Sequence, residues 1–369
     1  MKKKLLFLTV KFDTGGTEKV TYDIITRLDP DKYDITLMSM YAGGYYWDRL
    51  PEYVHRKYFF PKFIRYVIRY VTFAPGKLVY KTFIKEKYDV EIACGDDIPS
   101  RVVNHSPNAD SKKIAWIHMD VQERGYQGHE IKTEKGRSLF YKNFDHIVNV
   151  SFECERKFKE KFGDNLPTCV IYNPVPAKEI RQKADEKPAL KLPEDRFNVV
   201  CMGRFTPQKG FDRMLEAVNE LVKKGIRGFY VTVLGDGNDR GMLEEKIREY
   251  DLCEYVSMPG YFDNPYAVIK QANLFALTSR DESFSLAVAE AMVLGVPVMS
   301  TRCTGPVELL KDGEAGCLVD NSTEGILEGL TKILTDDEYY YDMVAKAKAN
   351  ADCFNIDDQI NLVEALLDC

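Results

Sequence analysis

The chain has 369 residues, of which 45% are apolar and 29% are Asp, Glu, Lys or Arg. This length is enough for two domains of ordinary size, and the composition is typical of a folded globular protein. The net charge of −6 argues against nucleic acid as the main partner, because phosphate binding needs a cationic surface.

Nothing in the sequence indicates export or membrane insertion. The first apolar run, Leu5–Val10, is followed by Lys11 and is too short for the core of a signal peptide. No stretch reaches the roughly 20 apolar residues that span a bilayer. The nine cysteines include no C-x2-C pair and no zinc-like spacing, which favours reduced thiols. We therefore expect a cytoplasmic protein that rests, at most, on the inner face of the cell membrane.

Short apolar strands alternate with longer helical patterns in both halves of the chain. In the first half, a strand at Leu5–Val10 precedes a glycine turn and a helix over Thr17–Leu28. Further strands are predicted at 34–39, 90–93, 113–118 and 146–150, and in the second half at 197–202, 230–234, 255–258, 274–277 and 297–300. This alternation predicts an α/β fold with two doubly wound, Rossmann-like domains.

The domain boundary is predicted near a proline-rich segment. We assign residues 1–175 to the first domain and 176–351 to the second. We predict the linker near 173–176, Asn-Pro-Val-Pro, and over 178–195, where prolines and mixed charges interrupt the apolar period. Ligands of open α/β sheets bind outside the carboxyl ends of the strands, so two such domains facing each other are expected to form one cleft.

The loop between the first strand and the first helix contains Gly15 and Gly16. Glycines let the backbone approach a ligand closely, and a helix N-terminus favours an anion. The third glycine of the dinucleotide fingerprint is missing, which disfavours a nicotinamide dehydrogenase. We predict that Gly15 and Gly16 contribute to the ligand site.

Residues 56–87 are strongly cationic within an acidic protein, with rings interleaved among Arg and Lys. Lys62, Arg65 and Arg69 share one face of a possible helix, which suits an interfacial helix on an anionic membrane. The alternative is a surface helix whose aromatic side packs on the core. Single-stranded nucleic acid would use similar chemistry, but no other feature supports it.

A histidine ends the predicted strand at 113–118. A lone histidine is more often structural than catalytic, but His118 lies at the strand end that faces the predicted cleft. We therefore predict that His118 contributes to the active site and that Asp120 contacts an acceptor.

The loop after the strand at 197–202 carries two cations, Arg204 and Lys209, before a helix that begins near Arg213. Two cations at the carboxyl end of a strand are suited to hold a diphosphate and to stabilise the charge on a leaving nucleotide. The alternative is an ordinary loop with solvated cations.

Two further turns in the second half follow strands. The turn 235–237, Gly-Asp-Gly, is as compatible with a purely structural role as with ligand contact. Gly260 and Tyr261 follow the strand at 255–258, at the sheet edge where backbone or ring would contact a ligand.

The most informative feature is a pair of glutamates, Glu282 and Glu290, with seven residues between them. Glu282 lies in a polar turn after an apolar strand, and Glu290 lies inside a predicted helix. Their carboxylates are up to roughly 12 Å apart along the helix axis. The helix N-terminus between them favours an anion. The residues whose amides would face that anion are Ser283, Phe284, Ser285 and Leu286.

These motifs together resemble family 4 of the retaining glycosyltransferases, which have the GT-B fold. The resemblance rests on Gly203-Arg-x4-Lys-Gly210, Glu282-x7-Glu290 and Thr304-Gly-Pro-Val-Glu308. Many relatives have Gly or Pro at the position of Ser285, and a Gly at that of Pro174. In this fold the last helix, here 352–369, crosses back onto the first domain.

The resemblance implies a role for each motif. Arg204, Lys209 and the amides near Ser285 would bind the donor diphosphate. Glu282 would hold the sugar and Glu290 the ribose. His118 would lie near the reacting carbon, and the donor phosphate itself would take the acceptor proton. Gly16 would lie on the donor side and Gly15 on the acceptor side. Gly260 and Tyr261 would lie near the nucleobase.

The implied activity is transfer of a sugar, with retention, from UDP-hexose or UDP-N-acetylhexosamine to a glycan or lipid-linked acceptor. Bacterial surface polysaccharide synthesis is the expected setting. We expect no cofactor besides the donor and no metal, because no Asp-x-Asp pair stands in a plausible setting. The alternatives are a sugar-nucleotide epimerase or phosphorylase on the same fold, and a non-catalytic nucleotide-sugar-binding module.

Overall fold

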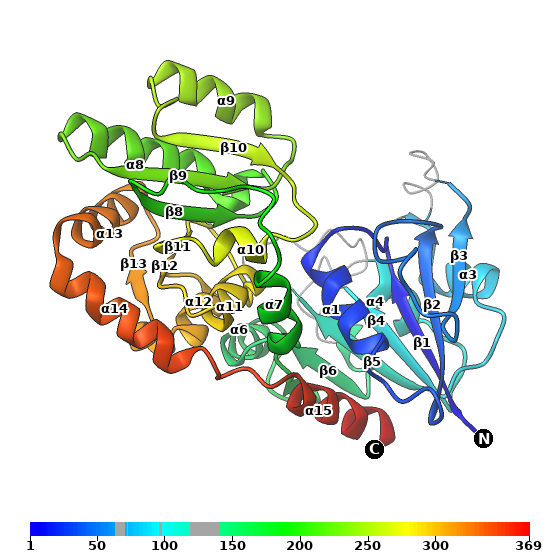
Figure 1. Ribbon diagram of the computed structural model, residues 1–369. Coiled ribbons are helices and arrows are strands. Elements are labelled where there is room, and N and C mark those ends of the chain that lie inside the picture. Colours follow the sequence, from blue (N-terminus) through cyan, green and yellow to red (C-terminus); the bar gives the residue numbers. More distant parts are fainter. Residues whose placement is uncertain (63–70, 72, 96–97, 119–139) are drawn as a thin grey trace. The chain divides into compact units, whose positions relative to one another are not determined.

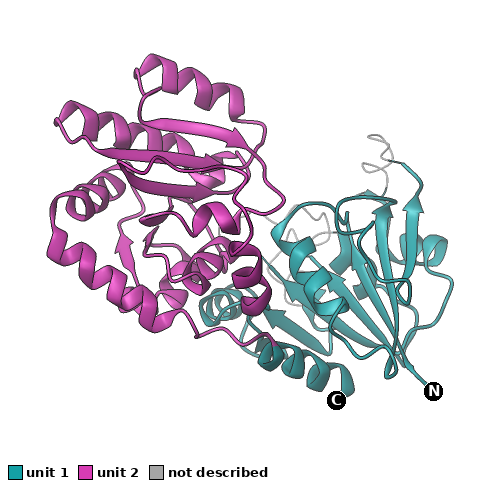
Figure 2. Cartoon of the chain, viewed as in Figure 1, with its two compact units in different colours: residues 1–174, 357–369 teal, residues 175–356 magenta. Residues whose placement is uncertain are grey.

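The computed structural model describes residues 1–62, 71, 73–95, 98–118 and 140–369. They form two compact units (Figure 1, Figure 2). Unit 1 comprises residues 1–174 and 357–369, and unit 2 comprises residues 175–356. Each unit contains a parallel sheet with helices in its connections, which confirms the predicted α/β class.

The described strands of unit 1 are β1 (Lys3–Thr9), β2 (Tyr33–Tyr41), β3 (His55–Phe60), β4 (Val90–Cys94), β5 (Lys112–Ile117), β6 (His146–Asn149) and β7 (Thr168–Val170). They lie in the order β3-β2-β1-β4-β5-β6-β7. Phe7 of β1 lies opposite Leu37 of β2 and Ile92 of β4. These continuous apolar strands match a parallel sheet whose two faces are both covered.

The described helices of unit 1 are α1 (Gly16–Ile25), α3 (Gly76–Phe83), α4 (Ile98–Asn104), α6 (Phe152–Phe162) and α15 (Ile356–Asp368). Ser151 shows why α6 begins where it does. Its hydroxyl accepts a hydrogen bond from the Cys154 amide at 3.2 Å and so satisfies one of the free amides of the first turn.

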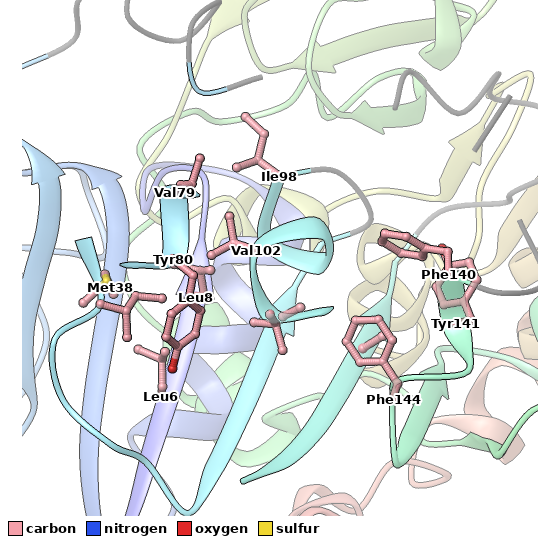
Figure 3. Packing of buried hydrophobic residues seen from close by; sticks show 14 of the residues in the cluster. Leu6, Leu8, Met38, Val79, Tyr80, Ile98, Val102, Phe140, Tyr141 and Phe144 are labelled. Atoms are coloured by element: carbon pink, nitrogen blue, oxygen red, sulfur yellow. The ribbon is translucent and has the colours of Figure 1, made fainter. Parts of the chain in front are cut away.

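The core of unit 1 lies between its sheet and the helices. Figure 3 shows Leu6 and Leu8 of β1 near Tyr80 of α3. The Tyr80 hydroxyl donates to Oε1 of Glu91, which is fully buried in β4. Burial raises the pKa of this carboxyl, because a charge is poorly solvated there.

The last helix, α15, packs on unit 1 through one face made by Ile360, Val363, Leu366 and Leu367. Lysines from two strands approach its C-terminus. Lys3 donates to the Leu367 carbonyl at 2.6 Å, and Lys112 donates to the Leu366 carbonyl at 3.1 Å. Cations at a helix C-terminus complement the helix dipole. The apolar pattern of the C-terminal segment 352–369 predicts an amphipathic helix over Ile356–Leu367, and the observed helix, Ile356–Asp368, matches it.

The described strands of unit 2 are β8 (Phe197–Met202), β9 (Phe229–Leu234), β10 (Val256–Gly260), β11 (Leu274–Leu277), β12 (Val298–Thr301) and β13 (Cys317–Val319). They lie in the order β10-β9-β8-β11-β12-β13. Because β8 pairs with β11, the loops that follow these two strands leave the sheet side by side.

The helices of unit 2 are α7 (Ala177–Ala184), α8 (Phe211–Lys223), α9 (Arg240–Glu249), α10 (Tyr266–Ile269), α11 (Leu286–Val293), α12 (Thr304–Leu309), α13 (Thr323–Thr335) and α14 (Asp337–Asn350). Alternate residues of β8 enter different cores. Val199 and Cys201 pack with α8, whereas Val200 packs with Val288 and Met292 of α11. This period of two places helices on both faces of the sheet.

One sequence prediction was wrong. The segment 178–195 was predicted to be a linker, yet α7 occupies its first part and belongs to unit 2. Ala177, Ile180 and Ala184 are buried with helical spacing. Two of the three are alanines, so the apolar period was too weak to be recognised among the charges.

The cationic stretch 56–87 is described only in part. Residues 56–60 belong to a strand, β3, which pairs with β2. Phe59 stacks on Phe83 of α3 at 4.3 Å, and Tyr80 is buried, so these rings pack on the core. Arg65 and Arg69 lie outside the described residues. In the described part of the chain, no helix has the length and apolar character to cross a bilayer.

Candidate functional site

The loops after β8 and β11 are locked together at the carboxyl edge of the unit 2 sheet. Gly210 ends the β8 loop with a φ of 65°, in the left-handed region that favours glycine. A Cβ at this position would lie 2.1 Å from the Thr278 carbonyl oxygen, so no larger residue fits. The Thr278 hydroxyl in turn donates to the Lys209 carbonyl at 3.1 Å.

This contact brings together two residues that the sequence analysis singled out separately. Lys209 forms an ion pair with Oε1 of Glu282, although the two are 73 positions apart. The Ser279 hydroxyl donates to the same oxygen at 2.9 Å. Glu282 is buried, so the cation and the hydroxyl offset the cost of placing its charge away from water. Sequence reasoning missed Ser279, because nothing distinguishes it from an ordinary turn serine.

The turn after Glu282 leads into the N-terminus of α11. Ser285 precedes the first residue of this helix with a φ of 70°, in the left-handed region that favours glycine. Its hydroxyl is buried and has no hydrogen-bond partner among the described residues. The Glu282 carbonyl accepts a hydrogen bond from the Gly305 amide at 2.8 Å, which ties this turn to the predicted Thr304–Glu308 motif.

Glu290 lies inside α11 and is almost fully buried, with 4% of its surface exposed. It accepts a hydrogen bond at Oε1 from the Tyr266 hydroxyl at 3.0 Å. Tyr266 comes from α10, a helix of only four residues. No sequence pattern indicated this pairing, since a tyrosine after a proline is an ordinary helix start.

A buried arginine holds the β11 loop through a hydrogen bond to its backbone. Arg213 of α8 donates to the Thr278 carbonyl at 2.6 Å and to Oδ1 of Asn321 at 2.9 Å. Beside it, Arg280 makes a two-pronged ion pair with Asp212, with bonds of 2.8 and 2.7 Å. Sequence reasoning placed Arg213 only at a helix start and did not predict this support.

The remaining predicted residues of unit 2 lie at the ends of β8 and β10. Arg204 is exposed just after β8, and Tyr261 is 55% exposed just after Gly260. The amide of Gly235 donates to the Gly260 carbonyl at 2.8 Å. A Cβ at Gly235 would lie 2.0 Å from the Gly203 carbonyl oxygen, so this glycine is required by packing.

Unit 1 contributes the other predicted residues. Gly15 and Gly16 begin α1, and the Glu18 carboxylate folds back against Gly15 and ends 3.9 Å from Lys11. A negative group therefore already lies at this helix N-terminus.

His118 follows β5 in unit 1, and Asp120 lies outside the described residues. The His118 ring stacks with Trp116 at 6.3 Å between centroids. Burial lowers the pKa of the His118 imidazole to about 4, so the ring is neutral at neutral pH.

Comparison with known proteins identifies the domain that carries the glutamate pair. A family model described as "Glycosyl transferases group 1" matches residues 182–350. These residues match the model of that family, which covers a little less than half of the chain. The match covers the whole run from Arg204 to Glu308, so the resemblance seen in the motifs is confirmed.

Several relatives in sequence are bacterial glycosyltransferases. The lipopolysaccharide core biosynthesis glycosyltransferase LpsE of Rhizobium meliloti is 32% identical over 157 residues, which are 42% of this chain and 45% of LpsE. A 4-alpha-N-acetylgalactosaminyltransferase of Campylobacter jejuni, acting on a diphospho-undecaprenol-linked sugar by its name, is 30% identical over 59% of this chain and 58% of its own. An uncharacterized glycosyltransferase of Haemophilus influenzae is 22% identical over the full length of both chains.

Solved structures show the same fold over nearly the whole chain. Anabaena Alr3699/HepE in complex with UDP and glucose has a TM-score of 0.76 at 18% identity, covering 99% of both chains. A glycosyltransferase from Rickettsia africae has a TM-score of 0.76 at 16% identity, covering 99% of this chain and 98% of its own. These similarities confirm the predicted GT-B fold.

Proposed function

We propose that this chain is a retaining glycosyltransferase. It moves a sugar from a nucleotide-diphosphate donor, UDP-hexose or UDP-N-acetylhexosamine, to a hydroxyl of a glycan or lipid-linked acceptor in bacterial surface polysaccharide synthesis. The observation that carries this proposal is the joining of Lys209, Glu282 and the N-terminus of α11 at one sheet edge. The UDP and UDP-glucose complexes of Alr3699/HepE support the choice of donor.

The residues of unit 2 suit the departure of a diphosphate. As the bond between the anomeric carbon and the phosphate oxygen breaks, negative charge grows on the leaving UDP. Lys209, Arg204 and the first amides of α11 stabilise that charge. The acceptor oxygen forms the new bond to the anomeric carbon on the same face, and its proton passes to a phosphate oxygen of UDP. Glu282 holds the sugar hydroxyls, and Glu290 holds the ribose.

This scheme assigns the work of charge stabilisation to cationic side chains and backbone amides, so it needs no metal. Among the residues that the structure describes, no group of three or more His, Cys, Asp or Glu is placed to hold one. We assign the neutral His118 to the sugar's outer hydroxyls, and Gly15 and Asp120 to the acceptor side. Gly260 and Tyr261 are assigned to the nucleobase.

We further propose that the protein contacts an anionic membrane where a lipid-linked acceptor is presented. Among the cations of the predicted stretch 56–87, Lys77, Lys81, Lys85 and Lys87 are exposed. Each such lysine near an anionic surface contributes about 1 kcal/mol of attraction. The transfer assay therefore includes lipid-linked acceptors in anionic vesicles.

The test is transfer from a panel of nucleotide-sugars, with the anomeric configuration of the product read by NMR. Glu282→Ala should lower turnover about 10²- to 10³-fold, as expected when one group that stabilises the transition state is lost. Glu220→Ala is the matched control, because Glu220 also pairs with a lysine, Lys223, but on the surface. Near wild-type turnover in Glu282→Ala would rule out the assigned site.

The same assay separates the alternatives. An epimerase converts the donor without any acceptor, and a phosphorylase needs inorganic phosphate. A binding module turns over nothing. Product with an inverted anomeric centre would contradict the proposed retention of configuration. It would not contradict the assignment of the donor site.

A further inference from the structure

The hydrogen bond between Tyr266 and Glu290 is buried at both ends. Tyr266 is 7% exposed and Glu290 is 4% exposed, and the bond of 3.0 Å joins two helices that pack against each other, α10 and α11. Glu290 lies in the middle of α11, where backbone amides are already used by the helix. Its carboxylate therefore takes hydrogen bonds from groups outside the backbone of its own helix, and the Tyr266 hydroxyl is one of them.

Tyr266 is held firmly enough to orient that carboxylate. The Asn264 side chain accepts a hydrogen bond from the Tyr266 amide at 3.2 Å, which fixes the start of α10. The next residues of this helix, Val268 and Ile269, are fully buried in the same core as Val288 of α11. A hydroxyl fixed in this way restricts rotation of the carboxylate. The hydrogen bond between them is stronger than a neutral one, because its acceptor is charged.

We propose that Tyr266 is a positioning residue that holds Glu290 in the orientation that accepts hydrogen bonds from the ribose hydroxyls of the donor. The pair thereby makes the site prefer ribonucleotides over 2′-deoxyribonucleotides. The inference rests on the proposed function, in which Glu290 binds the ribose. Tyr266 lies outside the two motifs, the glutamate pair and the cation loop, from which the donor site was predicted.

The test is calorimetric binding of UDP and of 2′-deoxy-UDP to the full chain and to Tyr266→Phe, which removes only the hydroxyl. The hydroxyl acts through the ribose contact, so the variant should bind UDP about three- to tenfold more weakly, the usual effect of one hydrogen bond. Its affinity for 2′-deoxy-UDP should change much less. The preference for UDP therefore falls by about the same factor.

Tyr340→Phe is the matched control, because the Tyr340 hydroxyl also donates within unit 2, to the Asn273 carbonyl at 3.2 Å. It should leave both affinities unchanged. If Tyr266 has a purely structural role, Tyr266→Phe should bind UDP and 2′-deoxy-UDP more weakly by the same factor. That result, or no change in either affinity, overturns the inference. If Tyr266→Phe does not fold, Tyr266→Met, which also lacks a donor, is measured instead with the same expected loss of preference.

Glu290→Gln separates this inference from the function on which it rests. If the wild-type chain shows no preference for UDP, or Glu290→Gln leaves that preference intact, the ribose role of Glu290 is wrong. If Glu290→Gln removes the preference and the Tyr266 variant keeps it, only the role of Tyr266 is wrong.

Discussion

Individual residues at the site are held in conformations that their own chemistry disfavours. Ser285 has a φ of 70°, and a non-glycine residue in this region pays roughly 1–2 kcal/mol. Ser285 lies between the turn that carries Glu282 and the first residue of α11, Leu286. The strain is therefore located where the predicted diphosphate binds, which is typical of functional turns.

Glycine at this position should relieve the strain. Ser285→Gly is expected to raise the free energy of unfolding by about 0.5–1 kcal/mol, because the relief exceeds the extra chain entropy of glycine. The measurement is chemical denaturation of unit 2. Ser283→Gly, two residues earlier and without a positive φ, should instead destabilise by about 0.5–1 kcal/mol. Equal losses in both variants would show that Ser285 is not strained.

Among the helices, α15 illustrates how a distant segment completes a unit. It follows unit 2 in the sequence, yet it buries its apolar face on unit 1. The lysines at its C-terminus come from β1 and β5, two strands of the same sheet. Apolar packing and helix-end charges thus fix the helix to the amino ends of these strands.

The apolar face should dominate the contribution of α15 to stability. Leu367 is 1% exposed, and Leu367→Ala should lower the free energy of unfolding of unit 1 by about 2–5 kcal/mol. Leu362 lies on the same helix but is 50% exposed, so Leu362→Ala should change the free energy of unfolding by less than about 0.5 kcal/mol. Thermal and urea unfolding measure both. A small loss for Leu367→Ala would mean that α15 docks mainly through its charges.

At the scale of the whole molecule, the predicted site residues divide between the two units. The cations and both glutamates belong to unit 2, which contains the group 1 glycosyltransferase match. His118 belongs to unit 1, and the prediction that it faces the glutamates remains a prediction. In the proposed function, unit 2 therefore provides most of the donor-binding residues, and His118 of unit 1 takes part in the transfer step.

Substitution of His118 tests that division. His118→Ala should leave the affinity for UDP within about twofold and lower kcat by about 10²-fold, because the ring acts on the sugar rather than on the nucleotide. Since its pKa is about 4, the wild-type kcat profile should show no step from this residue between pH 5 and 8. Calorimetry and initial rates at several pH values provide the measurement. A loss of UDP affinity as large as the loss of kcat would contradict the division.

The sequence by itself determined the α/β class, most strands, and the motifs at the carboxyl ends of β8 and β11. These features are local, because burial and turn chemistry act on neighbouring residues. Only the tertiary structure decided that Lys209 meets Glu282 and that Tyr266 meets Glu290. The first contact depends on β8 lying next to β11, an order that folding selects and no local pattern encodes. The second depends on two helices packing over one face of that sheet.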